Sequence, residues 1–210
     1  MAIRLLIADD HEVCRAGLKS LLEETDIEIV AEAENGLEAL ERTFSLRPDV
    51  VLLDVRMPQC DGITCLGRIK LDAPAIPVLI FSSYDNPTYV ARAVALGAAG
   101  YISKTCRRAE IIEAIRAVAG GETIWSREEL RRVTGALSVP RSNSEVDVPL
   151  TKREGEVLKQ LAFGLTNKEI AQALGISYET VKEHVQHVLR KIGVSDRTQA
   201  AVWAVRKELV

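Results

Sequence analysis

The sequence has no apolar run that approaches the roughly 20 residues needed to span a bilayer, so it predicts no membrane helix. Its N-terminal apolar stretch is too short, before Asp9 and Asp10, to act as a secretory signal. The four cysteines are scattered, form no Cys-x-x-Cys pair and have no histidine cluster near them. Reduced structural thiols are therefore favoured over a redox or metal role. Together these absences predict a cytoplasmic protein.

What the chain does contain is ordinary for a globular protein. Its 210 residues are 47% hydrophobic and 27% charged, which suits one large domain or two ordinary ones. The charge is unevenly spread, because residues 150–210 hold 10 Lys and Arg against 7 Asp and Glu although the whole chain carries −3. The excess of positive charge in the C-terminal part weakly favours an anionic partner for that part.

The first 120 residues alternate between short apolar runs and segments of helical periodicity. Five such pairs in strict alternation predict a doubly wound (βα)5 parallel sheet with helices on both faces. The expected strands are 4–8, 27–31, 50–53, 78–81 and 101–102, and the expected helices are 13–22, 37–46, 63–71, 89–96 and 109–118.

The pattern changes after the double glycine at 120–121. A capping-box sequence predicts a further helix over 126–137, and a stretch rich in serine and proline predicts a linker over 138–149. From 150 onward all segments have helical character. We therefore expect three parts: an α/β domain over 1–121, a linker helix and flexible linker over 122–149, and a small all-α four-helix domain over 150–210.

Polar side chains end four of the five predicted strands. Asp9 and Asp10 follow the first strand, Asp54 the third, Ser82 ends the fourth, and Lys104 follows the fifth. Because the carboxyl ends of parallel strands meet at one rim of a sheet, we expect these groups to converge. Carboxylates without Cys or His suit Mg²⁺. A carboxylate beside such an ion and a lysine can accept a phosphoryl group.

The motifs at this rim resemble the receiver domain of two-component response regulators. They are D-D-H at 9–11, D-V-R-M-P at 54–58, F-S-S at 81–83 and G-Y-I-S-K at 100–104. The resemblance implies that Asp54 accepts phosphate from a histidine kinase. It also implies a direct Mg²⁺ site of Asp10, Asp54 and the backbone carbonyl of Arg56, with Asp9 bound through water. Its remaining assignments are Ser82 as switch hydroxyl, Tyr101 as switch aromatic and Lys104 as phosphate-contacting amine.

The C-terminal part carries the spacing of a helix-turn-helix. Ala171 would allow close helix approach, Gly175 would permit the turn, and Val181 would pack the second helix on the first. That second helix has an apolar stripe opposite a polar face, as a recognition helix in the major groove requires. The same three positions also fit a small helical bundle that binds protein.

Wider motifs favour a DNA-binding helix-turn-helix over a protein-binding bundle. L-T-K-R-E-G-E-V-L at 150–158 and R-T-Q-A-A-V at 197–202 resemble the LuxR-type DNA-binding domain, and the full chain resembles the NarL/FixJ class of response regulators. The resemblance implies base reading by Lys182, Glu183 and Gln186, and phosphate contacts by Lys168, Thr180, His187 and Lys191. It places a dimer contact on Ala200, Ala201, Trp203 and Ala204, unless these residues only pack the domain's own core.

Three classes of function compete on these residues. An aspartate-based phosphohydrolase usually has a second aspartate two positions after the first, where this chain has Arg56. A phosphorylation-independent DNA-binding protein usually loses part of the acidic cluster, which is whole here. We therefore predict a regulator without enzymatic activity beyond its own phosphoryl transfer and slow autodephosphorylation. Phosphorylation would release or dimerise the C-terminal domain, with double-stranded DNA, a second copy and RNA polymerase as partners.

Overall fold

The computed structural model describes residues 2–83, 86–125, 150–207 and 209. Contacts within the chain divide it into two compact units, one of residues 1–85 with 96–125 and the other of residues 86–95 with 126–210. The predicted helix over 126–137 and the predicted linker over 138–149 lie outside the described residues. In the described part of the chain, every helix falls short of the length and apolar character that crossing a bilayer requires.

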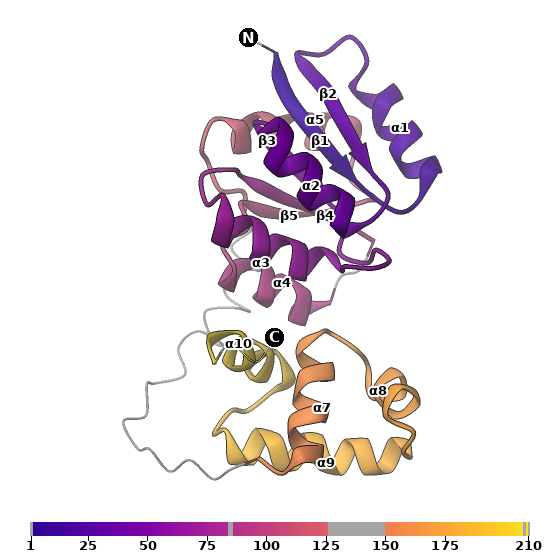
Figure 1. Cartoon of the computed structure of the whole chain (residues 1–210), viewed down its shortest axis with the longest axis vertical. Helices are drawn as coiled ribbons and strands as arrows, with labels where there is room; N and C mark the ends of the chain where they lie inside the picture. The colour runs from indigo at the N-terminus through magenta and orange to yellow at the C-terminus, as the bar shows by residue number, and fades with distance from the viewer. Residues whose placement is uncertain (1, 84–85, 126–149, 208, 210) are drawn as a thin grey trace. The chain divides into compact units, whose positions relative to one another are not determined.

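The first unit is built on one parallel sheet of five strands (Figure 1). The strand order is β2-β1-β3-β4-β5, which is the doubly wound arrangement that the alternating pattern predicts. Ala8 lies opposite Leu53 where β1 pairs with β3, so the two strand ends are level. The strands are β1 (Ile3–Ala8), β2 (Ile27–Ala33), β3 (Val50–Leu53), β4 (Val78–Ser82) and β5 (Gly100–Ser103).

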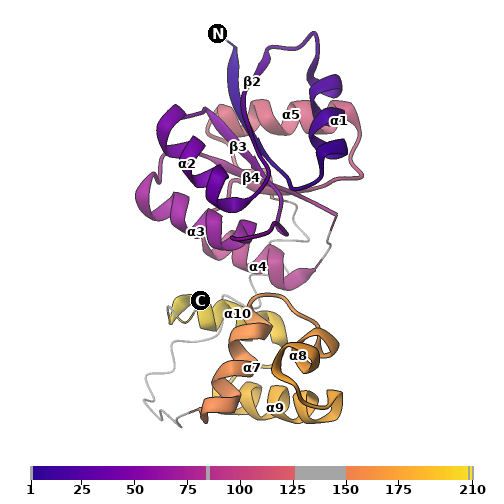
Figure 2. The same ribbon diagram turned by 45° about the vertical axis from the view of Figure 1, so that its right-hand side comes forward.

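Helices of the first unit cover both faces of this sheet (Figures 1 and 2). On one face, Leu18 of α1 and Ile115 of α5 pack in one apolar cluster with Leu5 and Ile7 of β1. The other face is covered by α2 and α3, whose inward side chains include the fully buried Ile63. The four helices are α1 (Glu12–Leu22), α2 (Gly36–Leu46), α3 (Gly62–Asp72) and α5 (Arg108–Ala119).

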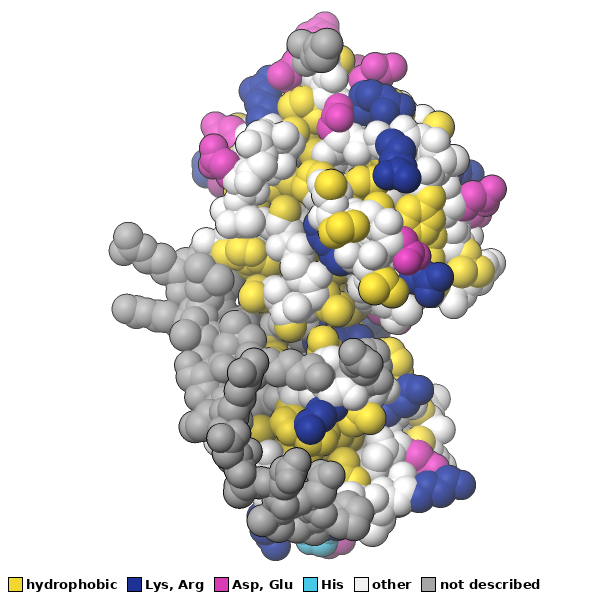
Figure 3. All heavy atoms as spheres, turned by 60° about the vertical axis from the view of Figure 1, so that its left-hand side comes forward, with side chains coloured by type: hydrophobic (Ala, Val, Ile, Leu, Met, Phe, Trp, Pro, Cys, Tyr) yellow, Lys and Arg dark blue, Asp and Glu magenta, His cyan; other side chains and the backbone are white. Residues whose placement is uncertain are grey.

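The first unit continues past the predicted boundary at 121. Ile124 forms a parallel bridge with Gly100 at the edge strand, and its amide donates to the Ala99 carbonyl at 2.8 Å. A side chain at position 100 would collide with Ile124, so glycine is needed for this close approach. On the face shown in Figure 3, acidic and basic side chains of this unit lie intermingled.

The described residues of the second unit are helical, as predicted for 150–210, and the unit also includes α4, which the sequence pattern assigned to the first domain. Thr151 and Thr166 cap their helices through reciprocal capping boxes, and the Asp196 carboxylate accepts the Gln199 amide, so a side-chain cap starts each of these three helices. Val157, Ile170 and further apolar side chains form the core. The helices are α4 (Pro87–Ala95), α7 (Lys152–Ala162), α8 (Asn167–Leu174), α9 (Tyr178–Lys191) and α10 (Arg197–Arg206).

Candidate functional site: an acidic pocket and a helix-turn-helix

Two buried carboxylates of the first unit lie side by side at the ends of neighbouring strands. Asp9 follows β1 and is 1% exposed, while Asp54 follows β3 and is 3% exposed. The Asp54 amide donates to the Ala8 carbonyl at 2.8 Å, and the Asp9 amide donates to the Ala33 carbonyl at 3.0 Å. These backbone bonds continue the sheet by one residue and fix both carboxylates at its carboxyl rim.

Lys104 connects the two carboxylates. Its Nζ lies 2.7 Å from Asp54 Oδ2 and 2.7 Å from Asp9 Oδ2. The Lys104 amide donates to the Ser82 carbonyl at 3.0 Å, so the lysine is anchored at the end of β4 while its side chain reaches across to β1 and β3. The structure thus brings together residues from four strand ends, as the sequence pattern predicts.

Burial and neighbouring charges shift the pKa values of the three pocket residues in different directions. Desolvation raises the pKa of Asp54, and the Lys104 ammonium only partly offsets it. For Asp9, burial also raises the pKa, but hydrogen bonds from Cys14, Lys104 and the His11 amide outweigh it and lower the pKa overall. Burial would lower the pKa of Lys104, but its bonds to Asp54 and Asp9 outweigh burial and raise it. The pocket therefore holds one cation among carboxylates that repel each other.

The pocket contains a donor set that fits a divalent cation. Ligand atoms of Asp9, Asp10, His11 and Asp54 all lie within 4.8 Å of one another. Two buried carboxylates that share one lysine leave negative charge that a hard cation would neutralise. His11 was not among the predicted ligands, and its Nδ1 lies 2.7 Å from Asp10 Oδ1. Its position directly after Asp9 and Asp10 is the sequence signal that could have placed it among the predicted ligands.

The other predicted residues of the first unit lie on β4, on β5 and in the loop after β3. Ser82, at the end of β4, is 1% exposed. Tyr101 of β5 is 8% exposed, and in the sheet register it pairs with Ile80 of β4. Arg56 is partly buried two residues after Asp54. The switch roles of Ser82 and Tyr101, and the metal role of the Arg56 carbonyl, remain predictions.

In the second unit, α8 and α9 form the predicted helix-turn-helix. Gly175 caps α8 in the left-handed region, with φ of 63°, which glycine adopts without strain. Ser177 then accepts the Thr180 amide and begins α9. Val181 is fully buried and packs in the same core as the partly buried Ala171. All three key positions of the motif therefore have the environment that the spacing predicts.

The predicted base-reading residues lie on the exposed side of α9. Lys182, Glu183 and Gln186 are all exposed, on the side opposite the buried Val181 and Val188. Of the predicted phosphate contacts, Lys168 and His187 are exposed and Thr180 is partly buried. Surface placement is what DNA contact requires, and these roles remain predictions.

Lys191 has a different environment. Its Nζ lies 2.7 Å from Oε2 of Glu154, a carboxylate that is 4% exposed. The same Glu154 oxygen accepts the Thr151 amide at 2.7 Å. The ion pair joins the end of α9 to the start of α7, so Lys191 has a structural role that local sequence patterns did not indicate.

The predicted dimer residues of α10 divide into two groups. Ala200, Ala201 and Ala204 are fully buried and belong to the core of the second unit, whereas Trp203 is only partly buried against it. For the three alanines the structure supports the alternative reading, in which they pack the domain's own core. A dimer contact on this helix remains a prediction.

The geometry agrees with two family matches that together span most of the chain. Residues 5–116 match the response regulator receiver domain, and residues 148–204 match the luxR family of bacterial regulatory proteins. The chain belongs to the two-component response regulators. In this family the chemistry is phosphoryl transfer to the regulator itself, so the prediction that the chain is not otherwise an enzyme is confirmed.

Relatives match this response regulator over nearly the whole chain. This response regulator is 38% identical to the response regulator protein VraR of Staphylococcus aureus (strain NCTC 8325 / PS 47), over 100% of both chains. The crystal structure of the response regulator ChrA, from a haem-sensing two-component system, is 36% identical with a TM-score of 0.54 and covers 100% of this chain and 99% of that one. An RcsB–DNA complex, 24% identical with a TM-score of 0.61 over 97% and 98% of the two chains, shares the fold.

Proposed function

We propose that this response regulator is a cytoplasmic transcription regulator that a histidine kinase phosphorylates on Asp54 in the presence of Mg²⁺. The observation that carries the proposal is the Asp54 carboxylate, which is 3% exposed and lies 2.7 Å from Lys104. Lys104 is equally close to Asp9. One amine is therefore held where it can contact a group on Asp54.

The chemistry proposed for Asp54 is nucleophilic attack on phosphorus. A carboxylate oxygen forms the new O–P bond, the N–P bond of the kinase phosphohistidine breaks, and its electron pair returns to the imidazole. Asp9, Asp10 and Asp54 would hold Mg²⁺ together with the Arg56 carbonyl. Bound there, the ion would neutralise charge on the transferring phosphoryl oxygens. Lys104, already at the carboxylate, would contact the same oxygens.

The output proposed for the second unit is sequence-specific binding of double-stranded DNA. Ser82 and Tyr101 would respond to the phosphoryl group, and this response would release or dimerise the helix-turn-helix domain. A dimer would read two half-sites related by symmetry, and RNA polymerase would be the further partner. A differential affinity of a few kcal/mol is enough to reverse such an equilibrium.

The exposed face of α9 would read the bases. Lys182 suits guanine, whereas the Glu183 carboxylate can accept a hydrogen bond from cytosine N4. Lys168, Thr180, His187 and Lys191 would contact phosphates, which position the protein without specifying sequence. Lys191 could do so only while it also neutralises Glu154, from which its Nζ lies 2.7 Å.

Replacing Glu183 with alanine is expected to relax base preference at a single position. Loss of the cytosine contact should reduce discrimination at one G·C pair of the half-site by about 1–3 kcal/mol. Binding selections with a library of half-sites measure this, and Glu179→Ala, an exposed glutamate in the first turn of the same helix, is the control. If Glu183→Ala lowers affinity equally for all sequences, or leaves binding unchanged, Glu183 does not read a base.

The proposed function as a whole can be tested by gel-shift binding of the full chain to its promoter DNA, with and without an acyl phosphate and Mg²⁺. Phosphorylation is expected to strengthen binding by about 5–150-fold, the range typical of coupling between sites. Omitting either the acyl phosphate or Mg²⁺ should return the affinity to its basal value. Equal affinity under all conditions would contradict the proposal.

A further inference from the structure

A buried arginine lies directly behind the acidic pocket. Arg15 is on α1, one turn after the pocket loop 9–11, and its side chain is 8% exposed. A guanidinium is seldom buried unless its donors are satisfied. The contacts that it makes therefore indicate what this buried charge does.

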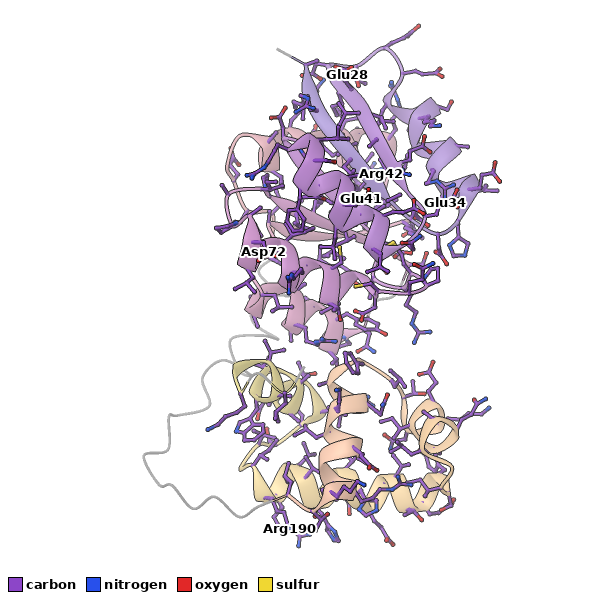
Figure 4. The ribbon with its side chains drawn as sticks, in the orientation of Figure 1. Glu28, Glu34, Glu41, Arg42, Asp72 and Arg190 are labelled. Atoms are coloured by element: carbon purple, nitrogen blue, oxygen red, sulfur yellow. The ribbon has the colours of Figure 1, made fainter. Side chains whose placement is uncertain are left out.

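Arg15 bridges the loops that follow two neighbouring strands. Its Nη1 donates to the backbone carbonyl of Asp9 at 2.8 Å, and its Nη2 donates to Glu34 Oε1 at 2.7 Å. Its Nε lies 3.4 Å from Glu32 Oε2. Asp9 directly follows β1, whereas Glu32 is the next-to-last residue of β2 and Glu34 directly follows that strand. Figure 4 shows Glu34 at that end of β2, beside the start of α2.

The anchor on the β2 side is itself held in place. The Glu34 amide lies 3.3 Å from Glu38 Oε2, and the Asn35 side chain caps α2 by accepting the Glu38 amide. Asn35 is 7% exposed. Because this loop is fixed by a helix cap, a bond from Arg15 to Glu34 can transfer that rigidity to the β1–α1 loop.

The contact with Asp9 is to its backbone rather than to its carboxylate. The carboxylate contacts Lys104 through Oδ2 and the His11 amide through Oδ1, at 3.0 Å. Glu34 and Glu32 balance the charge of Arg15 where it lies. The guanidinium can therefore set the position of the Asp9–Asp10 segment without acting as a counter-charge in the pocket.

We propose that Arg15 is a positioning residue of the acidic pocket. It joins the Asp9 carbonyl to Glu34 and so holds the 9–11 loop in the conformation that binds a divalent cation. The inference deepens the proposed function, since it concerns the same cation site. Lysine cannot replace arginine here, because one ammonium cannot reproduce the fork that reaches both partners.

Arg15→Gln in the full chain is the variant that tests this. Its affinity for Mg²⁺, measured by calorimetric titration, should fall about tenfold, the lower end of the effect of residues that orient metal ligands. Because the effect is one of position, the loss should be the same in dilute and concentrated salt. On a logarithmic scale, the Mg²⁺ affinity of Arg15→Lys should lie closer to that of Arg15→Gln than to that of wild type.

Lys19→Gln is the matched control. Lys19 lies one helical turn after Arg15, also pairs with Glu32, and carries the same charge, but it is 52% exposed and has no bond to Asp9 among the described contacts. Its Mg²⁺ affinity should stay within about twofold of wild type at moderate salt, where surface charges are largely screened. Equal affinities for the Arg15→Gln and Lys19→Gln proteins would overturn the proposal.

Amide hydrogen exchange of the metal-free protein gives a second readout. The His11 amide should exchange at least about tenfold faster in Arg15→Gln, whereas amides of the sheet core should not change, since only the local opening is eased. Uniformly faster exchange would show general destabilisation and would contradict a positioning role. If wild type binds no Mg²⁺, the proposed function fails, while the exchange data still decide whether Arg15 holds the loop.

Discussion

Asp54→Asn is expected to make DNA binding unresponsive to phosphoryl donors. The amide has nearly the shape of the carboxylate but cannot act as the nucleophile, so the roughly 5–150-fold strengthening expected for wild type should fall to no change. Radiolabelled acyl phosphate should leave the variant unlabelled, while its basal DNA affinity should equal that of the unphosphorylated wild type. Labelling of another residue, with DNA binding still switched, would contradict the assignment of Asp54.

The same substitution should stabilise the first unit at neutral pH. Burial raises the pKa of Asp54, so the folded state binds this proton more tightly than the unfolded state. The contribution of Asp54 to stability therefore falls as the pH rises from 3.8 through the raised pKa. Asp54→Asn has no carboxyl at this position and so does not lose stability in this way. Urea unfolding at several pH values should therefore give the variant a higher free energy of unfolding than wild type, and the difference should grow as the pH rises from the ordinary to the raised pKa of Asp54. Asp72→Asn, on the surface of α3 beside Arg68, is the control, and an equal advantage in both variants would contradict the role of Asp54.

Glu154→Gln is expected to lower the unfolding free energy of the second unit by about 1–3 kcal/mol, the range for hydrogen bonds to charged groups. The Glu154 Oε2 atom contacts Lys191 Nζ and the Thr151 amide, each at 2.7 Å. The amide oxygen can still accept hydrogen bonds, but it cannot neutralise the ammonium. The loss should appear in urea unfolding of the full chain, followed through Trp203 fluorescence in a Trp125→Phe background.

The pH dependence identifies this contact. The hydrogen bond from Lys191, with that from the Thr151 amide, lowers the pKa of Glu154 from 4.5 to about 2. A depressed pKa means that the stability is present above pH 4.5 and is lost as the pH falls towards the folded-state value. Glu154→Gln should lack that part of the acid dependence. Glu156 is a half-exposed neighbour on α7 that pairs with Arg153, and Glu156→Gln should retain the acid dependence of the unfolding free energy. The same pH dependence in both variants would argue against the role of Glu154.

Local sequence patterns predicted an element reliably where all the residues that determine it lie in one short stretch. The apolar run Val50–Leu53 predicted β3 residue for residue, because a strand buried on both faces needs no polar alternation. Thr151 and Thr166 start their helices through caps whose partner lies three residues away, so this signal is also local. Of the glycines that follow helices, Gly97 and Gly121 have positive φ, whereas Gly120 has φ of −75°.

The sequence by itself determined the alternating fold, the helix-turn-helix and the convergence of Asp9, Asp54 and Lys104 on one rim, because local periodicity shows where parallel strands end and which polar residues follow them. Only the tertiary structure decided which long charged side chains are paired. Arg15 with Glu34, and Lys191 with Glu154, join residues that are distant in sequence, and periodicity indicates which face of a helix is polar but not which partner lies opposite. The sequence also does not show what small residues such as Ala200 and Ala204 pack against. A small side chain suits close packing within one chain as well as close packing between two chains.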